Sequence, residues 1–140
     1  MILPGPIVVI EDDQDDQQIL EVVFKELEYY ENVIFFADAE KALQYLTTTT
    51  TKPFLIFSDI NMPKISGIQL RAQLLARQFL AHETPFLFLT TSTNKNNIKD
   101  AYSNAAHGYF IKPNSYLEFK EMIKSIIEYW QKCEAPIYVL

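Results

Sequence analysis

Residues 54–70 have the sequence FLIFSDINMPKISGIQL. An apolar run from Phe54 to Phe57 comes first, and Ser58-Asp59 ends it. A short, continuous apolar run is typical of a strand that is covered on both faces of a parallel sheet. After a connecting loop, the spacing of apolar residues from Ile68 to Leu80 predicts a helix. The stretch is therefore a strand, a loop and a helix, with a carboxylate at the end of the strand.

The same unit recurs along the chain. Apolar runs predict further strands at residues 7–10, 33–36, 86–89 and 109–111. Helical spacing predicts the other helices at about residues 15–30, 39–46, 98–106 and 119–130, with Asp38 capping the second of these. The threonine run at residues 47–51 is expected to be a loop. Strands that alternate with helices form a parallel sheet with right-handed crossovers, so we expect an α/β fold of the (βα)5 kind.

The composition is that of a globular domain. The chain has 140 residues, of which 49% are hydrophobic and 21% are charged. We expect one domain over residues 1–140, with a core at about 6–132, a tail at 133–140 and no output domain. A net charge of −6 and a pI near 4.8 argue against nucleic-acid binding. The apolar runs are too short to cross a membrane, and the lone Cys133 fits a reducing compartment, so we expect a cytoplasmic protein.

Polar residues follow four of the predicted strands. Glu11 and Asp12 follow the first, Asp59 the third, Thr90 the fourth and Lys112 the fifth. Ligands bind beyond the carboxyl ends of the strands in open parallel sheets, so these side chains should meet at one rim. Converging carboxylates repel one another unless a cation lies among them, and oxygen ligands favour Mg²⁺. One carboxylate could then attack phosphorus, while the lysine ammonium and the threonine hydroxyl bind phosphoryl oxygens.

Each of these features alone has a plain structural explanation. Acidic residues after a strand often form the negatively charged first turn of a helix. A lysine before proline is commonly a solvated loop residue, and Thr90-Thr91 could cap a helix. Four such features at four strand ends, in the order that one site requires, favour the functional interpretation.

Four segments resemble the response-regulator receiver family, over nearly the whole chain. They are IVVIEDDQDD at 7–16, FLIFSDINMPKISGIQL at 54–70, FLFLTTSTN at 86–94 and GYFIKPNS at 108–115. The second segment is the most specific, because an aspartate followed by Met-Pro and then glycine at this spacing is rare outside the family. The resemblance implies a flavodoxin-like, doubly wound sheet of five parallel strands in the order 2-1-3-4-5.

The resemblance also implies roles for the acidic residues at the rim. Asp59 matches the phosphoacceptor, and Asp12 matches the direct Mg²⁺ ligand. Glu11 would act on the metal through water, and Asn61 matches the position that lends its backbone carbonyl to the metal. Asp13 would cap the following helix rather than bind the metal.

Three further residues match positions that respond to the phosphoryl group. Lys112 would contact it directly. Thr90 and Tyr109 match the switch pair, in which the hydroxyl moves to the phosphoryl group and the aromatic ring turns inward. The bond between Lys112 and Pro113 is a candidate for the cis form, because X-Pro bonds carry a low cis penalty.

The implied function is that of a stand-alone receiver in a two-component phosphorelay, not of an enzyme that turns over a substrate. A sensor histidine kinase or a phosphotransfer protein would phosphorylate Asp59, and a downstream protein would bind the result. We expect the output surface on the face formed by the 98–106 helix, the fifth strand and the final helix. The apolar residues Ile137–Leu140 would pack on the domain or on a second copy, as in a homodimer.

Three alternatives share parts of this pattern. A flavodoxin-like electron carrier has the same topology, but carboxylates after the first strand would repel its FMN phosphate. A pseudo-receiver, which acts as a constitutive interaction module, would lack Asp59, Asp12 or Lys112, and all three are present. A metal-dependent phosphatase of the aspartyl-phosphate type needs a second acid two residues after the nucleophile, where this chain has Asn61.

Overall fold

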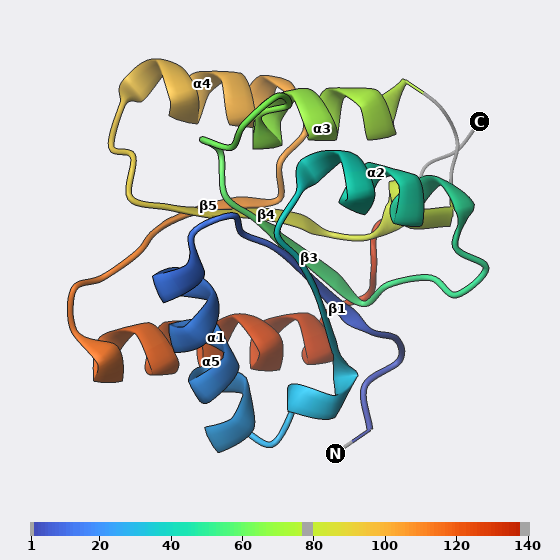
Figure 1. The fold of residues 1–140 in the computed structure, drawn as a ribbon. Coiled ribbons are helices and arrows are strands. Elements are labelled where there is room, and N and C mark those ends of the chain that lie inside the picture. The colour runs from blue at the N-terminus through green and yellow to red at the C-terminus, as the bar shows by residue number, and fades with distance from the viewer. Residues whose placement is uncertain (1, 77–79, 138–140) are drawn as a thin grey trace.

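The computed structural model describes residues 2–76 and 80–137. Within these ranges its centre is a sheet of five parallel strands in the order β2-β1-β3-β4-β5, which confirms the predicted fold (Figure 1). The strands are β1 (Ile7–Ile10), β2 (Val33–Phe36), β3 (Leu55–Ser58), β4 (Phe86–Thr90) and β5 (Gly108–Ile111). The strand order reverses between β1 and β3, which is where doubly wound sheets bind their ligands.

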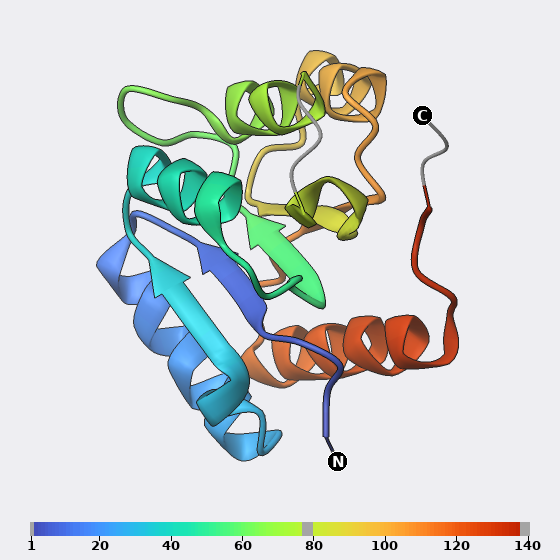
Figure 2. The ribbon, with the colours of Figure 1, turned by 90° about the vertical axis from the view of Figure 1, so that its right-hand side faces the viewer.

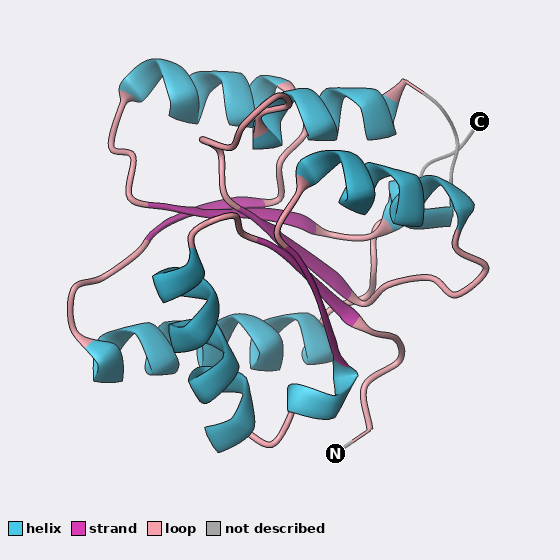
Figure 3. Cartoon of the chain, in the orientation of Figure 1, coloured by secondary structure: helices cyan, strands magenta, loops and turns pink. Residues whose placement is uncertain are grey.

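Helices cover both faces of this sheet (Figures 1 and 3). One face carries α2 (Ala39–Thr48), α3 (Gly67–Leu75) and α4 (Lys95–Ser103), and the other carries α1 (Gln14–Glu26) and α5 (Tyr116–Lys132). Two short 3-10 helices, η1 (Tyr30–Asn32) and η2 (Leu80–Glu83), precede β2 and β4. Figure 2 shows the sheet between the two helical layers, with the tail leaving the end of α5. No helix in the described ranges combines the length and the apolar character that a membrane crossing requires.

Alternate residues of the strands pack against opposite helical layers. Val9 and Phe57 belong to the buried cluster with α1 and α5, whereas Val8 and Ile56 belong to the cluster with α2 and α3. Every residue of β1, β3 and β4 is buried. Because side chains alternate across a strand and both faces are covered, these strands are apolar except at their carboxyl ends, where Ser58 and Thr90 lie at the rim.

The end of α1 and the start of α4 differ from the predicted boundaries because of a left-handed residue and a polar cap. The helix predicted over Ile68–Leu80 ends at Leu75, and residues 77–79 of that prediction lie outside the described ranges. α1 ends at Glu26 and not near residue 30, since Glu28 has a φ of 65° that no α-helix accommodates. α4 begins at Lys95 and not at residue 98, because the Asn94 side chain accepts hydrogen bonds from the backbone N–H groups of Asn96 and Asn97. The Asp38 cap of α2 is confirmed.

The threonine run was predicted wrongly in part. Thr47 and Thr48 belong to α2, and the loop begins at Thr49. The Thr47 hydroxyl donates to the Leu43 carbonyl at 2.9 Å, and the Thr48 hydroxyl donates to the Gln44 carbonyl at 2.7 Å. These bonds to the preceding turn let threonine continue a helix despite its low propensity.

A buried arginine links α3 to the end of α4, which the sequence did not suggest. Arg71 is fully buried, and its guanidinium donates to the carbonyls of Asn104 and Ala105 at 3.2 and 3.0 Å. The same group lies over the ring of Phe86, 5.3 Å from its centroid. Arg71 therefore fixes the loop between α4 and β5 from inside the domain.

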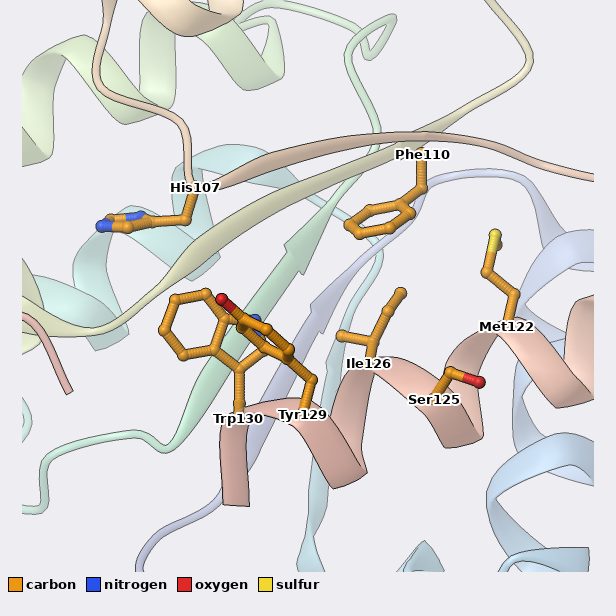
Figure 4. A pocket seen from close by; sticks show the side chains of 7 residues that line it. All are labelled: His107, Phe110, Met122, Ser125, Ile126, Tyr129 and Trp130. Carbon is orange, nitrogen blue, oxygen red and sulfur yellow. The ribbon is translucent and has the colours of Figure 1, made fainter. Parts of the chain in front are cut away.

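His107 is a second, partly buried polar residue, directly before β5. Its Nδ1 accepts a hydrogen bond from the backbone N–H of Phe86 at 3.0 Å, and its ring meets Trp130 edge-on at 6.0 Å beside the groove between β5 and α5 (Figure 4). Burial, reinforced by the positive charge of Arg71, lowers the pKa of His107 to about 4. A neutral ring supplies the lone pair that this hydrogen bond needs.

Replacing His107 by asparagine is expected to flatten the pH dependence of stability. An unfolded histidine takes up its proton near pH 6.5, but the folded ring resists protonation until about pH 4, so this group destabilises the fold as the pH falls between those values. Between pH 7.5 and 5 the wild type should lose roughly 1–2 kcal/mol more than H107N, whose side-chain oxygen can still accept from Phe86. Urea unfolding at both pH values measures this, and parallel losses in the two proteins would contradict it.

Candidate functional site

The polar residues predicted to converge do lie at one rim of the sheet. Backbone hydrogen bonds continue past the strand ends, from Asp59 N–H to the Ile10 carbonyl at 3.0 Å and from Lys112 N–H to the Thr90 carbonyl at 2.8 Å. Glu11 N–H likewise donates to the carbonyl of Phe36 at 2.9 Å. Glu11, Asp59 and Lys112 are thus positioned by the sheet itself and not by a loose loop.

Three carboxylates form a cluster at the centre of this rim. Ligand oxygens of Glu11, Asp12 and Asp59 all lie within 4.8 Å of one another. Glu11 is buried, whereas Asp12 and Asp59 are partly accessible. Oxygens at such spacing on two adjacent strand ends can bind one divalent cation.

Lys112 provides the positive charge beside this cluster. Its ammonium lies 2.5 Å from Oε1 of Glu11, 2.8 Å from Oδ2 of Asp16 and 3.3 Å from Oδ2 of Asp59. Asp16 was not among the residues predicted for the site. Its position in the sequence could have indicated the contact, because Asp16 lies in the first turn of the helix that follows the end of β1.

Burial and the neighbouring charges both shift the pKa values of Glu11 and Lys112. Burial raises the pKa of Glu11 to about 7, and the charge of Asp59 adds to the effect, while the bond to Lys112 opposes it. Burial works against the charge of Lys112, but its bonds to Asp16 and Glu11 and the charge of Asp59 raise its pKa above the usual value. Lys112 is therefore firmly cationic, and a second cation would complete the neutralisation of the carboxylates.

The Asp59 carboxylate is fixed by hydrogen bonds but remains partly accessible to solvent. Its Oδ1 accepts from the backbone N–H of Ile60 at 2.7 Å, and its Oδ2 faces Lys112. The side chain keeps 14% of its surface exposed. An oxygen fixed in this way can meet an incoming electrophile without a large rearrangement.

The loop after Asp59 returns tightly to the start of α3. Ser66 and Gln69 form a capping box at the start of that helix, and Gly67 N–H donates to the carbonyl of Ile60 at 2.8 Å. A Cβ on Gly67 would lie 2.0 Å from the carbonyl oxygen of Asp59. The glycine of the motif is thus required for close approach, and Asn61 is exposed within this loop.

Thr90 and Tyr109 are connected through the backbone of Ser92. The Thr90 hydroxyl accepts from Ser92 N–H at 3.2 Å, and the Tyr109 hydroxyl donates to the Ser92 carbonyl at 2.8 Å. Asn97 of α4 donates to the Ser92 hydroxyl at 2.8 Å. The Tyr109 ring packs inward against the α2–α4 side of the core, next to Phe88. The loop after β4 therefore links the two predicted switch residues, which the sequence alone did not indicate.

Two smaller expectations have opposite outcomes. Asp13 caps α1 as predicted, accepting from Asp16 N–H at 3.1 Å. The prediction of a cis peptide bond between Lys112 and Pro113 is wrong, because the chain has no cis peptide bond in the described ranges. The trans form is the lower in energy even before proline, and the turn after Lys112 is made without isomerisation.

Residues 7–124 match the family described as "Response regulator receiver domain". The match spans most of the chain and contains every residue of the rim described above. The chain belongs to this family, whose members are signalling domains of two-component systems.

Individual relatives agree with this assignment. The chain is 29% identical over 131 residues to the probable methanogenesis regulatory protein FilR2 of Methanothrix harundinacea, covering 91% of this chain and 84% of that protein. It is 25% identical over 132 residues to the response regulator Rcp1 of a Synechocystis species, covering 91% of this chain and 89% of Rcp1.

Solved structures share the fold. The phosphorylated cyanobacterial phytochrome response regulator RcpA superposes with a TM-score of 0.84 at 23% identity, covering 95% of this chain and 99% of RcpA. The Mn²⁺-bound form of Rcp1 superposes with a TM-score of 0.80 at 23% identity, covering 96% of this chain and 100% of that one.

Proposed function

We propose that this protein is a response regulator that accepts a phosphoryl group on Asp59 and signals by binding a partner in the phosphorylated form. The observation that carries the proposal is the ammonium of Lys112, 3.3 Å from the Asp59 carboxylate and beside a cluster of three carboxylates. A partly exposed carboxylate can attack phosphorus, and a fixed cation beside it stabilises the negative charge of the phosphoryl group.

A divalent cation fits the carboxylate cluster. Glu11, Asp12 and Asp59 bring three carboxylates together beside the one ammonium of Lys112, and the all-oxygen donor set matches Mg²⁺. Asp12 and Asp59 would bind it directly, Glu11 through water and Asn61 through its backbone carbonyl. Bound there, Mg²⁺ would neutralise charge on the phosphoryl oxygens. The Mn²⁺-bound form of Rcp1 supports the assignment.

The chain's own residues account for the transfer. An oxygen of the Asp59 carboxylate forms a bond to phosphorus as the phosphorus–nitrogen bond of a phosphohistidine donor breaks. The electron pair of that bond remains on the donor nitrogen, which then takes up a proton. The Lys112 ammonium stabilises charge on a phosphoryl oxygen, and the Thr90 hydroxyl donates to another after leaving Ser92. A histidine kinase or a phosphotransfer protein is the proposed donor.

We propose that phosphorylation changes the position of Thr90 and, through it, the face formed by α4, β5 and α5. A Thr90 hydroxyl that turns to the phosphoryl group gives up its bond to Ser92, which also holds Tyr109 and Asn97. That face exposes Tyr102, Ile111 and other apolar side chains that a partner protein could cover. The phosphorylated state then favours one arrangement of the loop and of α4, which is a population shift.

The location of the protein and one competing function bear on the same proposal. The chain covers 84% of FilR2 and 89% of Rcp1. It works in the cytoplasm, in keeping with the lone and exposed Cys133. A pseudo-receiver is the competing function, and the intact arrangement of Asp59, Asp12 and Lys112 favours the active form.

Acetyl phosphate with Mg²⁺ tests the proposal directly. The wild-type protein is expected to gain the mass of one phosphoryl group when Mg²⁺ is present and none when it is chelated. Asp59→Asn should gain nothing under either condition, because the amide is a poor nucleophile. Asp100→Asn, which changes an exposed aspartate on α4, is the matched control and should behave as the wild type.

Trp130 supplies a second signal in the same experiment. It is the single tryptophan of the chain and packs against Tyr129 and His107 on the side of the proposed output face. Beryllofluoride, a phosphoryl mimic, should change its fluorescence in the wild type and not in Asp59→Asn. A wild-type protein that is neither modified nor perturbed would be a pseudo-receiver.

A further inference from the structure

Asp16 contacts Lys112 from outside the carboxylate cluster. The other two partners of the Lys112 ammonium, Glu11 and Asp59, both belong to the cluster, whereas Asp16 does not. Asp16 stands on α1 and keeps 28% of its side chain exposed. Its contact with Lys112 joins residues 96 positions apart in the chain.

The three contacts match the three N–H donors of an ammonium group. The distances to Glu11 and Asp16 are short, 2.5 and 2.8 Å, and the distance to Asp59 is longer, 3.3 Å. Two donors are thus bound firmly, and the third points toward the carboxylate that would carry the phosphoryl group. A flexible lysine stem otherwise leaves its donors free to rotate.

We propose that Asp16 is a positioning residue, which fixes the ammonium of Lys112 so that its third N–H faces the phosphoryl site on Asp59. The inference rests on the proposed function, since it assigns Asp16 a part in the same transfer. Glu11 and Asp16 hold two donors before and after transfer. The third donor passes from Oδ2 of Asp59 to a phosphoryl oxygen. The lysine then needs no reorganisation in the transition state.

The first turn of α1 is well suited to hold such an anchor. The backbone N–H of Asp16 is bonded to the capping side chain of Asp13, and the Gln17 side chain donates to the Glu11 carbonyl at 2.5 Å. These bonds tie the helix start to the end of β1, so Asp16 and Glu11 approach Lys112 as one rigid unit. An anchor on a helix holds its geometry better than one on a loop.

Asp16→Ala tests the proposal, with Asp15→Ala as the matched control. Asp15 is an exposed aspartate in the same helical turn, so its removal changes the net charge and the helix start equally. Asp16→Ala should slow modification by acetyl phosphate at saturating Mg²⁺ about tenfold relative to Asp15→Ala. Mg²⁺ affinity, measured by calorimetry, should agree between the two variants within about twofold. Asp16→Asn keeps an acceptor oxygen and should recover the rate to within about threefold of the wild type.

Labelling of Lys112 by an amine-reactive acylating reagent, read by mass spectrometry, gives a signal that does not depend on phosphorylation. Lys112 should react faster in Asp16→Ala than in Asp15→Ala, because its ammonium has lost the hydrogen bond to Asp16. The inference is overturned if Asp16→Ala is modified as fast as Asp15→Ala, if its Mg²⁺ affinity falls in parallel with the rate, or if Asp16→Asn is as slow as Asp16→Ala. A wild type that is not modified at all would instead refute the proposed function, and the labelling result would still decide whether Asp16 holds Lys112.

Discussion

Replacing Gly67 by alanine is expected to destabilise the protein by about 3 kcal/mol or more and to slow modification of Asp59 strongly. The new Cβ would lie 2.0 Å from the carbonyl oxygen of Asp59 and 3.0 Å from its carbonyl carbon. Both atoms belong to the backbone, so the collision is relieved only by moving the loop that carries the phosphoacceptor or by displacing α3. Urea unfolding and the rate of acetyl phosphate modification measure the two effects.

Gly108→Ala is the matched control for this prediction. A Cβ at Gly108 would meet only side-chain atoms at close range, the ring edge of Phe110 at 2.7 Å and a methyl group of Leu87 at 3.2 Å. The Phe110 ring lines the open groove between β5 and α5, into which it can shift (Figure 4). The same change should therefore cost only about 1 kcal/mol there. Neither glycine has a positive φ, so the difference reflects whether the new Cβ meets fixed backbone atoms or a side chain that can move. Equal losses in the two variants would refute the explanation.

The strands and the site rim could be predicted because both follow from local sequence. A strand covered on both faces must be continuously apolar, so Ile7–Ile10 and Phe86–Leu89 are recognisable without any partner. Polar residues directly after such strands must meet at one edge when the strands are parallel. Glu11, Asp59 and Lys112 came together for that reason.

The parts that could not be predicted depend on side-chain contacts between distant segments. Asp16 looked like an ordinary acidic residue in the first turn of a helix, and only the folded chain brings it to Lys112, which follows β5. Ser92 joins Thr90 to Tyr109 through its backbone, which no side-chain pattern records. The early start of α4 depended on Asn94, whose capping role competes with its common role in turns.

Replacing Lys112 by methionine should have the second large effect, on function and on stability together. Modification of Asp59 by acetyl phosphate is expected to fall about a hundredfold, because a fixed donor to the phosphoryl oxygens is lost. In the absence of Mg²⁺ the free energy of unfolding should also fall, by about 3 kcal/mol, since Glu11 stays buried beside Asp59 and Asp16 without a cation. Rates and urea unfolding measured on one preparation report both losses.

Lys52→Met makes the same chemical change at an exposed ion pair and serves as the control. Lys52 lies 3.3 Å from Glu83, and about a third of each side chain is exposed, so the loss there should stay below about 1 kcal/mol. Mg²⁺ at a hundred times its dissociation constant stabilises a folded protein by about 2.7 kcal/mol. It should therefore restore much of the stability of Lys112→Met while leaving modification slow, because the metal can neutralise the carboxylates but cannot replace the donor that faces Asp59. If Lys112→Met were as stable as Lys52→Met without Mg²⁺, the carboxylates of the rim would not depend on Lys112 for their neutralisation, and the electrostatic account of the site would be wrong.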